Sequence, residues 1–224
     1  MPLPPLIQSG LGTLFSDIVV SNNSEAISVL KEHFTFRADE ITKGCQDSYG
    51  YALTAITVGL AAPDQKLAFV QKFLHSKITR DFADSIEINY LQPYAQSRGI
   101  AGEVLRKQFV GQLNQLIKYK DQLFQLQQFN QADLAALINY QSTETFTQSI
   151  LAELQSLAEV DDTLAIFLSQ GDLLGKAMLY FFHEIIRKDE RVAKTQAALQ
   201  QQGLAVSVQN IETAIKTAQD NLNQ

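Results

Sequence analysis

The sequence predicts an all-α fold, a bundle of about eight to ten helices without a sheet. Apolar residues recur every three or four positions along most of the chain, which is typical of helices that bury one face. No run alternates apolar and polar residues over a useful length, as a half-buried strand would. Proline, glycine and capping residues separate the apolar runs and set the expected helix boundaries.

The first part of the chain is expected to contain four helices. Apolar residues from Ile7 to Val19 lie on one helical face, and Asn23 or Ser24 can cap a short second helix. A third helix is expected over 39–60, and the run 64–92 forms a fourth that is long enough to contain a kink.

The segment Pro93 to Gly102 is predicted to be a loop, because it carries one proline and two glycines between long periodic runs. It divides the chain into an N-terminal helical subdomain, residues 1–92, and a C-terminal helical subdomain, residues 103–224. The alternative is one continuous domain with a loop at 93–102.

A long amphipathic helix is expected after this loop, over 105–124, with an unusual polar side. That side is rich in glutamine, a good helix former without charge: Gln108, Gln112, Gln115, Gln122 and Gln125. Such a face suits contact between helices, although a plain solvated surface is the more ordinary interpretation.

The remaining helices are predicted from their caps. Asn130 or Asp133 can start a helix that reaches Tyr140, and a helix over 143–157 comes next. Asp161 and Asp162 begin a shorter helix that Gly171 stops. From Leu173 to Gly203 we expect one long helix, which consists of a core part up to Ile186 and an exposed charged arm. A last helix is expected over 210–222, and its apolar stripe ends almost with the chain, which suggests that a further domain follows.

Composition excludes some classes of function. The net charge of −6 provides no positive field for phosphate backbones, so nucleic acid is not expected as a partner. The single cysteine, Cys45, cannot form an intramolecular disulfide, and it is interpreted as a small residue in a helix interface. A cytoplasmic location is the resulting expectation.

No spacing of polar residues makes a convincing active site. His33, His75 and His183 lie on separate predicted helices without a partner at metal-ligand spacing, and Arg187 stands where a His-Glu-x-x-His motif would need its second histidine. Phosphate-binding loops and nucleophile elbows are also missing from the sequence. We therefore predict no catalytic, cofactor-binding or metal-binding residues, no cofactor and no enzyme activity.

Two segments carry a family resemblance. The stretch GDLLGKAMLYFFHEIIRKDERVAKTQAALQQQGL, with CQDSYGYALTAITVGLA nearer the start, resembles helical N-terminal regions of large multidomain bacterial proteins, notably cyanobacterial ones with signalling NTPase or repeat modules. The resemblance implies an adaptor or effector-associated module attached to a sensor. It transfers no catalytic residue.

The expected function is a non-enzymatic interaction or adaptor module of a bacterial signalling or conflict system. Its partner would be another protein, a downstream domain of the same polypeptide or a second copy, contacted through the first helix, the glutamine-faced helix or the last helix. The alternative is a membrane-active helical-bundle effector that inserts its first helix. Membrane binding is not favoured, because Asp17 is the only charge of that helix and no lysine or arginine flanks it.

Overall fold

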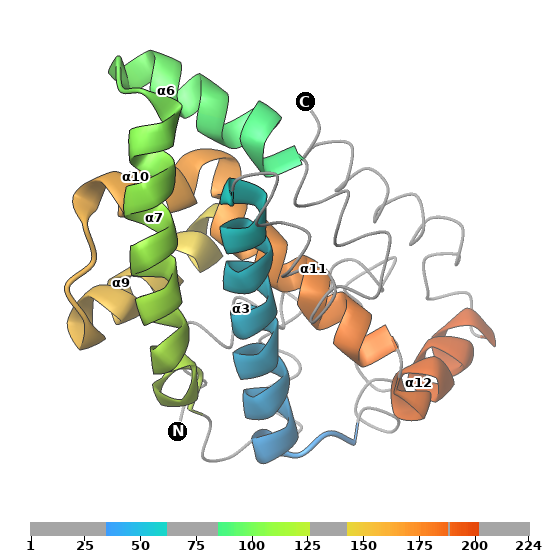
Figure 1. Cartoon of the computed structure of the whole chain (residues 1–224). Coiled ribbons are helices and arrows are strands. Elements are labelled where there is room, and N and C mark those ends of the chain that lie inside the picture. Colours follow the sequence, from blue (N-terminus) through green and yellow to red (C-terminus); the bar gives the residue numbers. More distant parts are fainter. Residues whose placement is uncertain (1–34, 62–84, 126–142, 188, 202–224) are drawn as a thin grey trace.

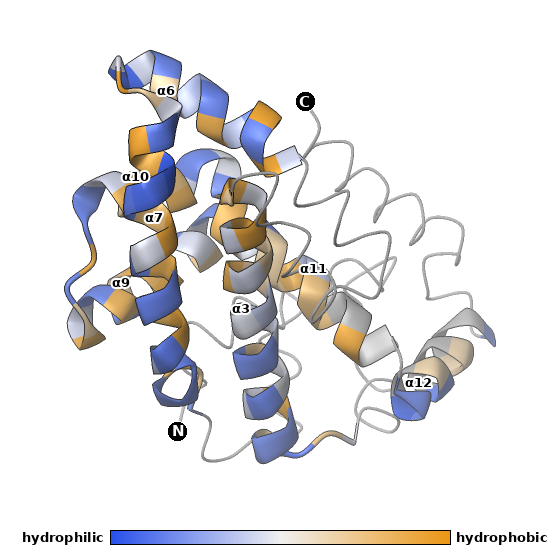
Figure 2. Cartoon of the chain, viewed as in Figure 1, coloured by the Kyte–Doolittle hydropathy of each residue, from blue (hydrophilic) through white to orange (hydrophobic). Residues whose placement is uncertain are grey.

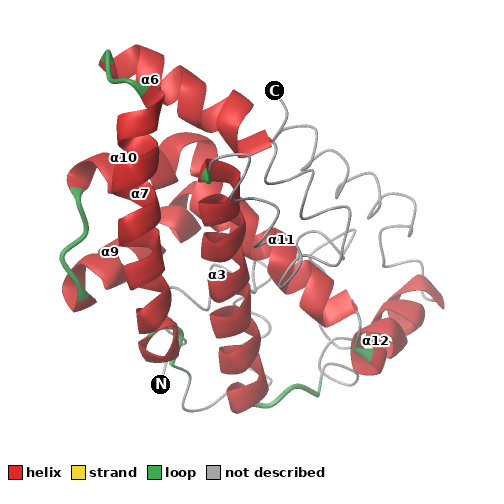
Figure 3. Ribbon diagram, viewed as in Figure 1, coloured by secondary structure: helices red, strands yellow, loops and turns green. Residues whose placement is uncertain are grey.

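The structure, a computed structural model, describes residues 35–61, 85–125, 143–187 and 189–201. Helices make up most of these residues and none of them lies in a strand (Figure 3), which confirms the all-α class for this part of the chain. Its five long helices are fewer than the eight to ten predicted for the whole chain: α3 (Ala38–Leu60), α7 (Gly102–Leu116), α9 (Thr143–Leu157), α11 (Leu173–Arg187) and α12 (Glu190–Gln201). The helices predicted over 7–19, 24–34, 130–140 and 210–222 lie outside the described residues.

Helix α3 packs against both α7 and α11 (Figure 1). Its predicted apolar face is confirmed, because one side of the helix is buried along its whole length: Ile41, Cys45, Tyr49, Ala52, Leu53, Ile56 and Leu60. Gly44 lets α11 approach closely, since a Cβ atom at this position would lie 3.1 Å from Cε2 of Phe182. The α3–α11 contact therefore depends on a glycine as well as on apolar area.

An aromatic cluster joins α7 to two short helices, α6 (Gln92–Arg98) and α10 (Asp162–Ser169). The ring of Phe109 stacks on that of Phe167 at 4.9 Å, and the ring of Tyr94 meets Phe167 edge-on at 5.6 Å. The Tyr94 hydroxyl donates a hydrogen bond to the Thr163 carbonyl at 2.9 Å. Aromatic pairs at these distances add stability beyond the area they bury, so the cluster fixes how the three helices meet.

The segment predicted as a loop at 93–102 is mostly helical, so this prediction is wrong. Pro93 stands near the start of α6, which continues without a break from a π-helical turn, Glu87–Leu91, since Leu91 and Gln92 have right-handed helical dihedral angles. Proline lacks the N–H donor of a regular helical residue, and the helix departs from regular α geometry in the turn before it. Gly99 ends α6 in a left-handed conformation with φ 64°, and the Ile100 N–H bonds to the Ala95 carbonyl at 3.1 Å. Proline and glycine thus mark the two ends of a short helix.

Buried side chains from both sides of residues 93–102 share one hydrophobic cluster, which includes Leu53, Phe109 and Leu174. The division into subdomains at 93–102 stays a prediction.

Helix α7 is shorter than the helix predicted over 105–124. The α-helix ends at Leu116 and tightens into a 3₁₀ segment, Ile117–Gln122. The Tyr49 hydroxyl donates a hydrogen bond to the Leu116 carbonyl at 3.1 Å. Phe124 has φ 61°, and its side chain is buried in the core. Burial of Phe124 outweighs continuation of the helix, because an aromatic side chain gains much more free energy than one backbone hydrogen bond.

The caps predicted for the later helices are confirmed at α10. Asp161 accepts hydrogen bonds from the N–H groups of Thr163 and Leu164 at the start of α10, and Gly171 follows its end with φ 56°. Helix α11 then begins, with Thr147 of α9 accepting a hydrogen bond from the Gly175 N–H at 3.2 Å. This bond satisfies one of the donors that a helix leaves free in its first turn.

The long helix predicted from Leu173 to Gly203 is two helices, so the prediction of a continuous arm is wrong. Its core part is confirmed: Tyr180, Phe181 and Phe182 are buried on α11. Helix α11 ends at Arg187, and Asp189 starts α12 by accepting the Arg191 N–H at 2.9 Å. Aspartate is favourable at an N-cap, so a new helix starts at this position. The spacing of the charged residues around it is equally compatible with one long helix.

Candidate interaction surface on helix α7

Helix α7 carries the candidate site, a line of outward-facing residues that we call the α7 stripe: Val104, Gln108, Gly111 and Gln115. All four are exposed, with Val104 at 57%. Their spacing of four, three and four places them on one side of the helix, while Leu105, Phe109, Leu113 and Leu116 face the core. Hydrophilic and hydrophobic residues accordingly both occur along α7 (Figure 2). The four residues of the stripe are uncharged, which lowers the desolvation cost of covering them, and the exposed Lys107 borders the stripe between Val104 and Gly111.

Gly111 is the most informative residue of the stripe. It stands in the middle of a 15-residue α-helix, where glycine costs about 1 kcal/mol relative to alanine. A Cβ atom at this position would meet no described atom within 4 Å. The glycine therefore serves no packing in the described part of the chain, whereas a helix backbone approaching from outside would gain from the missing side chain.

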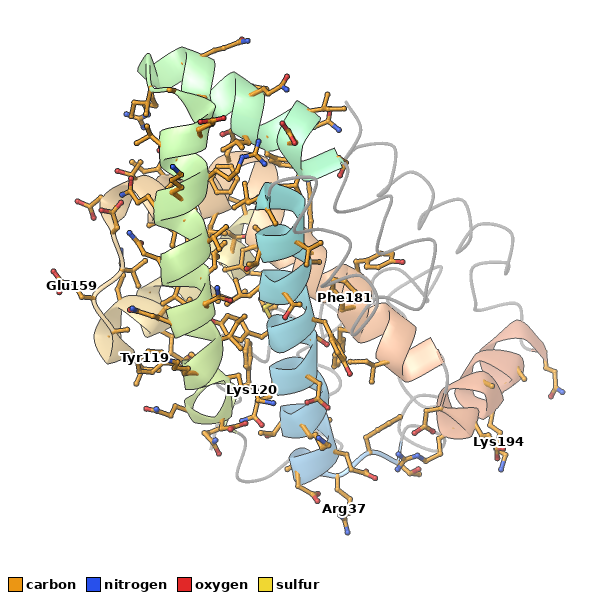
Figure 4. All side chains as sticks on the ribbon, viewed as in Figure 1. Arg37, Tyr119, Lys120, Glu159, Phe181 and Lys194 are labelled. Carbon is orange, nitrogen blue, oxygen red and sulfur yellow. The ribbon has the colours of Figure 1, made fainter. Side chains whose placement is uncertain are left out.

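A hollow of about 700 Å³ borders the C-terminal half of the stripe. Gln112, Gln115 and Tyr119 line one wall, and residues 158–162 line the other; Tyr119 and Glu159 lie on the same side of the bundle in Figure 4. Gln112 lies with its Oε1 atom buried and without a hydrogen-bond partner among the described residues. Asp161 already caps α10, so its carboxylate serves the fold.

A second hollow, of about 650 Å³, lies between α6 and α7 at the other end of the stripe. Two of its charged residues, Arg106 and Glu87, form an ion pair with each other. Nη2 of Arg106 lies 2.9 Å from Oε1 of Glu87, and Nη1 donates to the carbonyls of Leu60 at 2.8 Å and Ala61 at 3.3 Å. Arg106 thereby satisfies carbonyls at the C-terminus of α3, and we assign it a structural role.

The shifted pKa values of the described residues arise from burial in the core or from ion pairs. Burial raises the pKa of the Cys45 thiol to about 12, and burial together with the charge of Asp172 raises the pKa of Tyr90 to about 12. Both groups are protonated at neutral pH. The interpretation of Cys45 as a small interface residue is confirmed, since it is buried on α3.

The other surfaces and ligands considered from the sequence fall largely outside the described residues. The first and last helices, His33, His75 and the side chain of His183 lie there. Among the described residues, no group of three or more His, Cys, Asp or Glu side chains is placed to hold a metal ion. None of the described helices has the length and apolar character needed to cross a membrane.

The sequence singled out the glutamines of α7 but missed Val104 and Gly111. Their signal was present, because both share the four-three-four spacing with Gln108 and Gln115 and a mid-helix glycine is costly. Comparisons with protein-family models, with curated proteins and with solved structures find no match to this chain.

Proposed function

We propose that this protein is a non-enzymatic helical interaction module that binds a helix of a partner protein along the α7 stripe. The observation that carries the proposal is Gly111, an exposed glycine in mid-helix where an added Cβ atom would meet no described atom within 4 Å. The assignment to a cytoplasmic bacterial signalling or conflict system rests on the resemblance of two sequence segments and on the single cysteine.

The spacing of the stripe suits a packed helix. Helices pack with their axes 8–10 Å apart, and a glycine at the contact favours the short end of that range. Val104 supplies an apolar anchor, and the amides of Gln108 and Gln115 can donate and accept hydrogen bonds at its side. Depletion of charge from the centre of the patch, with polar groups around it, is typical of protein interfaces.

Three partners fit this surface: a separate protein, a downstream domain or a second copy of the chain. Each would present a helix to the same residues, so one experiment on the stripe addresses them all. A second copy gives crosslinked dimers of this chain, and a separate protein gives a heterologous adduct.

The test is photocrosslinking in cells that express the protein, with benzoylphenylalanine placed at Gln108. The matched control carries the same group at Gln148, an exposed glutamine within α9. We expect a discrete adduct from position 108 that is absent from position 148 and is lost when Gly111→Leu is added. Equal adduct patterns from the two positions, or an adduct that Gly111→Leu leaves unchanged, would contradict the proposal.

A further inference from the structure

The beginning of α12 is tied to the beginning of α3 by one arginine. We call the residues involved the Arg191 cluster: Arg191, Asp189, Glu40 and Phe36. Nη1 of Arg191 lies 3.1 and 3.0 Å from the two carboxylate oxygens of Glu40. Its Nε and Nη2 lie 3.0 and 2.8 Å from the oxygens of Asp189, and the guanidinium carbon lies 4.1 Å from the centre of the Phe36 ring.

Both carboxylates of the cluster also serve a helix N-terminus. Oε2 of Glu40 accepts the Arg37 N–H at 2.8 Å where α3 starts, and Oδ1 of Asp189 accepts the Arg191 N–H where α12 starts. A carboxylate at each N-terminus is favourable by itself, because the helix dipole places partial positive charge there. Two such carboxylates facing one another would repel without a cation between them. Hydrogen bonds from Arg191 lower the pKa of Glu40 and of Asp189, so both stay ionised around this arginine.

The described side chains of α12 make few other contacts with the bundle. Arg191 and Ala198 are half-buried, and Ala198 packs against the core, whereas Ala193, Lys194, Ala197 and Gln201 are exposed. Helix α12 lies beyond the end of α11, at the edge of the bundle (Figure 1). Among the described side chains of α12, the charged contacts of Arg191 are therefore the main link to the bundle, whereas α3 contacts α7 and α11 through buried apolar side chains.

We infer that α12 is a releasable segment, held on the bundle by the Arg191 cluster, and that losing the Arg191–Glu40 contact lets it move away while the rest stays folded. The side chains of Arg191 and Glu40 are 36% and 32% exposed, so solvent and salt reach the contact. The apolar core of the bundle is not weakened by screening in this way. Release would remove the Arg191 guanidinium from the face of the Phe36 ring.

The experiment measures the distance between α3 and α12 by electron–electron resonance of two spin labels. Lys43→Cys on α3 and Ala197→Cys on α12 provide exposed attachment sites, while the buried Cys45 stays unlabelled. Glu40→Gln is the decisive variant, because glutamine can still cap α3 through its amide oxygen but cannot form the ion pair. Arg191→Gln removes the cation itself. Lys194→Gln is the matched control, since it removes an exposed positive charge from the same helix (Figure 4).

At low salt we expect one short distance in the parent protein and in Lys194→Gln. In Glu40→Gln the ratio of released to docked molecules should rise about fivefold, the factor that corresponds to a partly exposed ion pair. Arg191→Gln should exceed this value, and 0.5 M NaCl should raise the ratio in the parent by a similar factor but have little further effect in Arg191→Gln.

Helical circular dichroism and thermal unfolding show whether the bundle survives in each variant. If Arg191→Gln fails to fold, the comparison of Glu40→Gln with Lys194→Gln still tests whether the ion pair holds α12 on the bundle. Identical distance distributions in these two variants would overturn the inference. Release that occurs only together with unfolding of the bundle would overturn it as well.

Discussion

Replacing Gly111 by alanine separates stability from binding at one position. The added methyl group meets no described atom within 4 Å, so it causes no clash in the described part of the chain. Alanine is about 1 kcal/mol more favourable than glycine in a helix interior. We therefore expect the free energy of unfolding of Gly111→Ala to rise by about 0.5 to 1 kcal/mol.

Gly44 provides the matched control for this prediction, because it is also a mid-helix glycine. A methyl group at position 44 would lie 3.1 Å from the Phe182 ring, against the contact between α3 and α11. Alanine brings the same gain in helix propensity at position 44, but overpacking there offsets it by about 1 to 3 kcal/mol, so the free energy of unfolding of Gly44→Ala should be lower than that of Gly111→Ala.

Urea unfolding followed by circular dichroism measures both changes, and the slope with denaturant shows whether the unfolding transition stays comparable. If Gly111→Ala lowers the midpoint, the glycine is needed for the fold of the chain, and the assignment of its open side to a partner is refuted. If Gly44→Ala and Gly111→Ala raise it equally, the packing of α3 on α11 is not as described.

Three further predictions concern Arg106, Thr147 and Cys45. Arg106→Met should lower the free energy of unfolding by about 2 kcal/mol, because Glu87 and two carbonyls lose a charged partner, and thermal unfolding measures this loss. Thr147→Val should cost about 1 to 2 kcal/mol by leaving the Gly175 N–H without its acceptor, whereas Thr147→Ser, measured in the same urea titration, should retain most of the stability. Because burial raises the pKa of Cys45 to about 12, the unfolded chain loses the thiol proton before the folded protein does. The contribution of Cys45 is complete below about pH 8.5 and falls toward pH 12 by at most about 1.4 kcal/mol per pH unit. Urea unfolding at pH 8, 9 and 10 should show a shallower decline for Cys45→Ala than for the parent, and identical declines would contradict the assignment.

The strongly periodic parts of the fold could be predicted from sequence, because burial of one helix face determines them. The face of α3 from Ile41 to Leu60 and the core part of α11 are of this kind. Asp161 could be identified as a cap because aspartate before an apolar run bonds free backbone donors in most contexts.

The helix boundaries that were predicted wrongly depend on contacts between residues far apart in sequence. Helix α7 ends where Tyr49 bonds the Leu116 carbonyl, and no local pattern reveals that bond. The break between α11 and α12 depends partly on Glu40, which binds Arg191 from 151 positions away. Pro93 was misleading for a different reason, since proline is favoured near the start of a helix as well as in turns.

The candidate site was half predictable. The glutamines of α7 indicated a polar face, but its centre could be located only once the structure showed that no described atom lies within 4 Å of a Cβ atom at Gly111. The sequence could not predict that Arg106 and Asp161 line the hollows beside α7. Both bind backbone groups at the ends of other helices, and the sequence alone does not place those helix ends near α7.

The most direct test of the α7 stripe is the affinity for the partner identified by crosslinking at Gln108, measured by isothermal titration for two leucine variants. Gly111→Leu fills the centre of the stripe, and Ala152→Leu adds a similar side chain at an exposed position of α9. We predict that Gly111→Leu weakens binding at least about tenfold, as expected for a central contact worth more than about 1.4 kcal/mol, and that Ala152→Leu leaves it unchanged. Equal dissociation constants for the two variants would contradict the account.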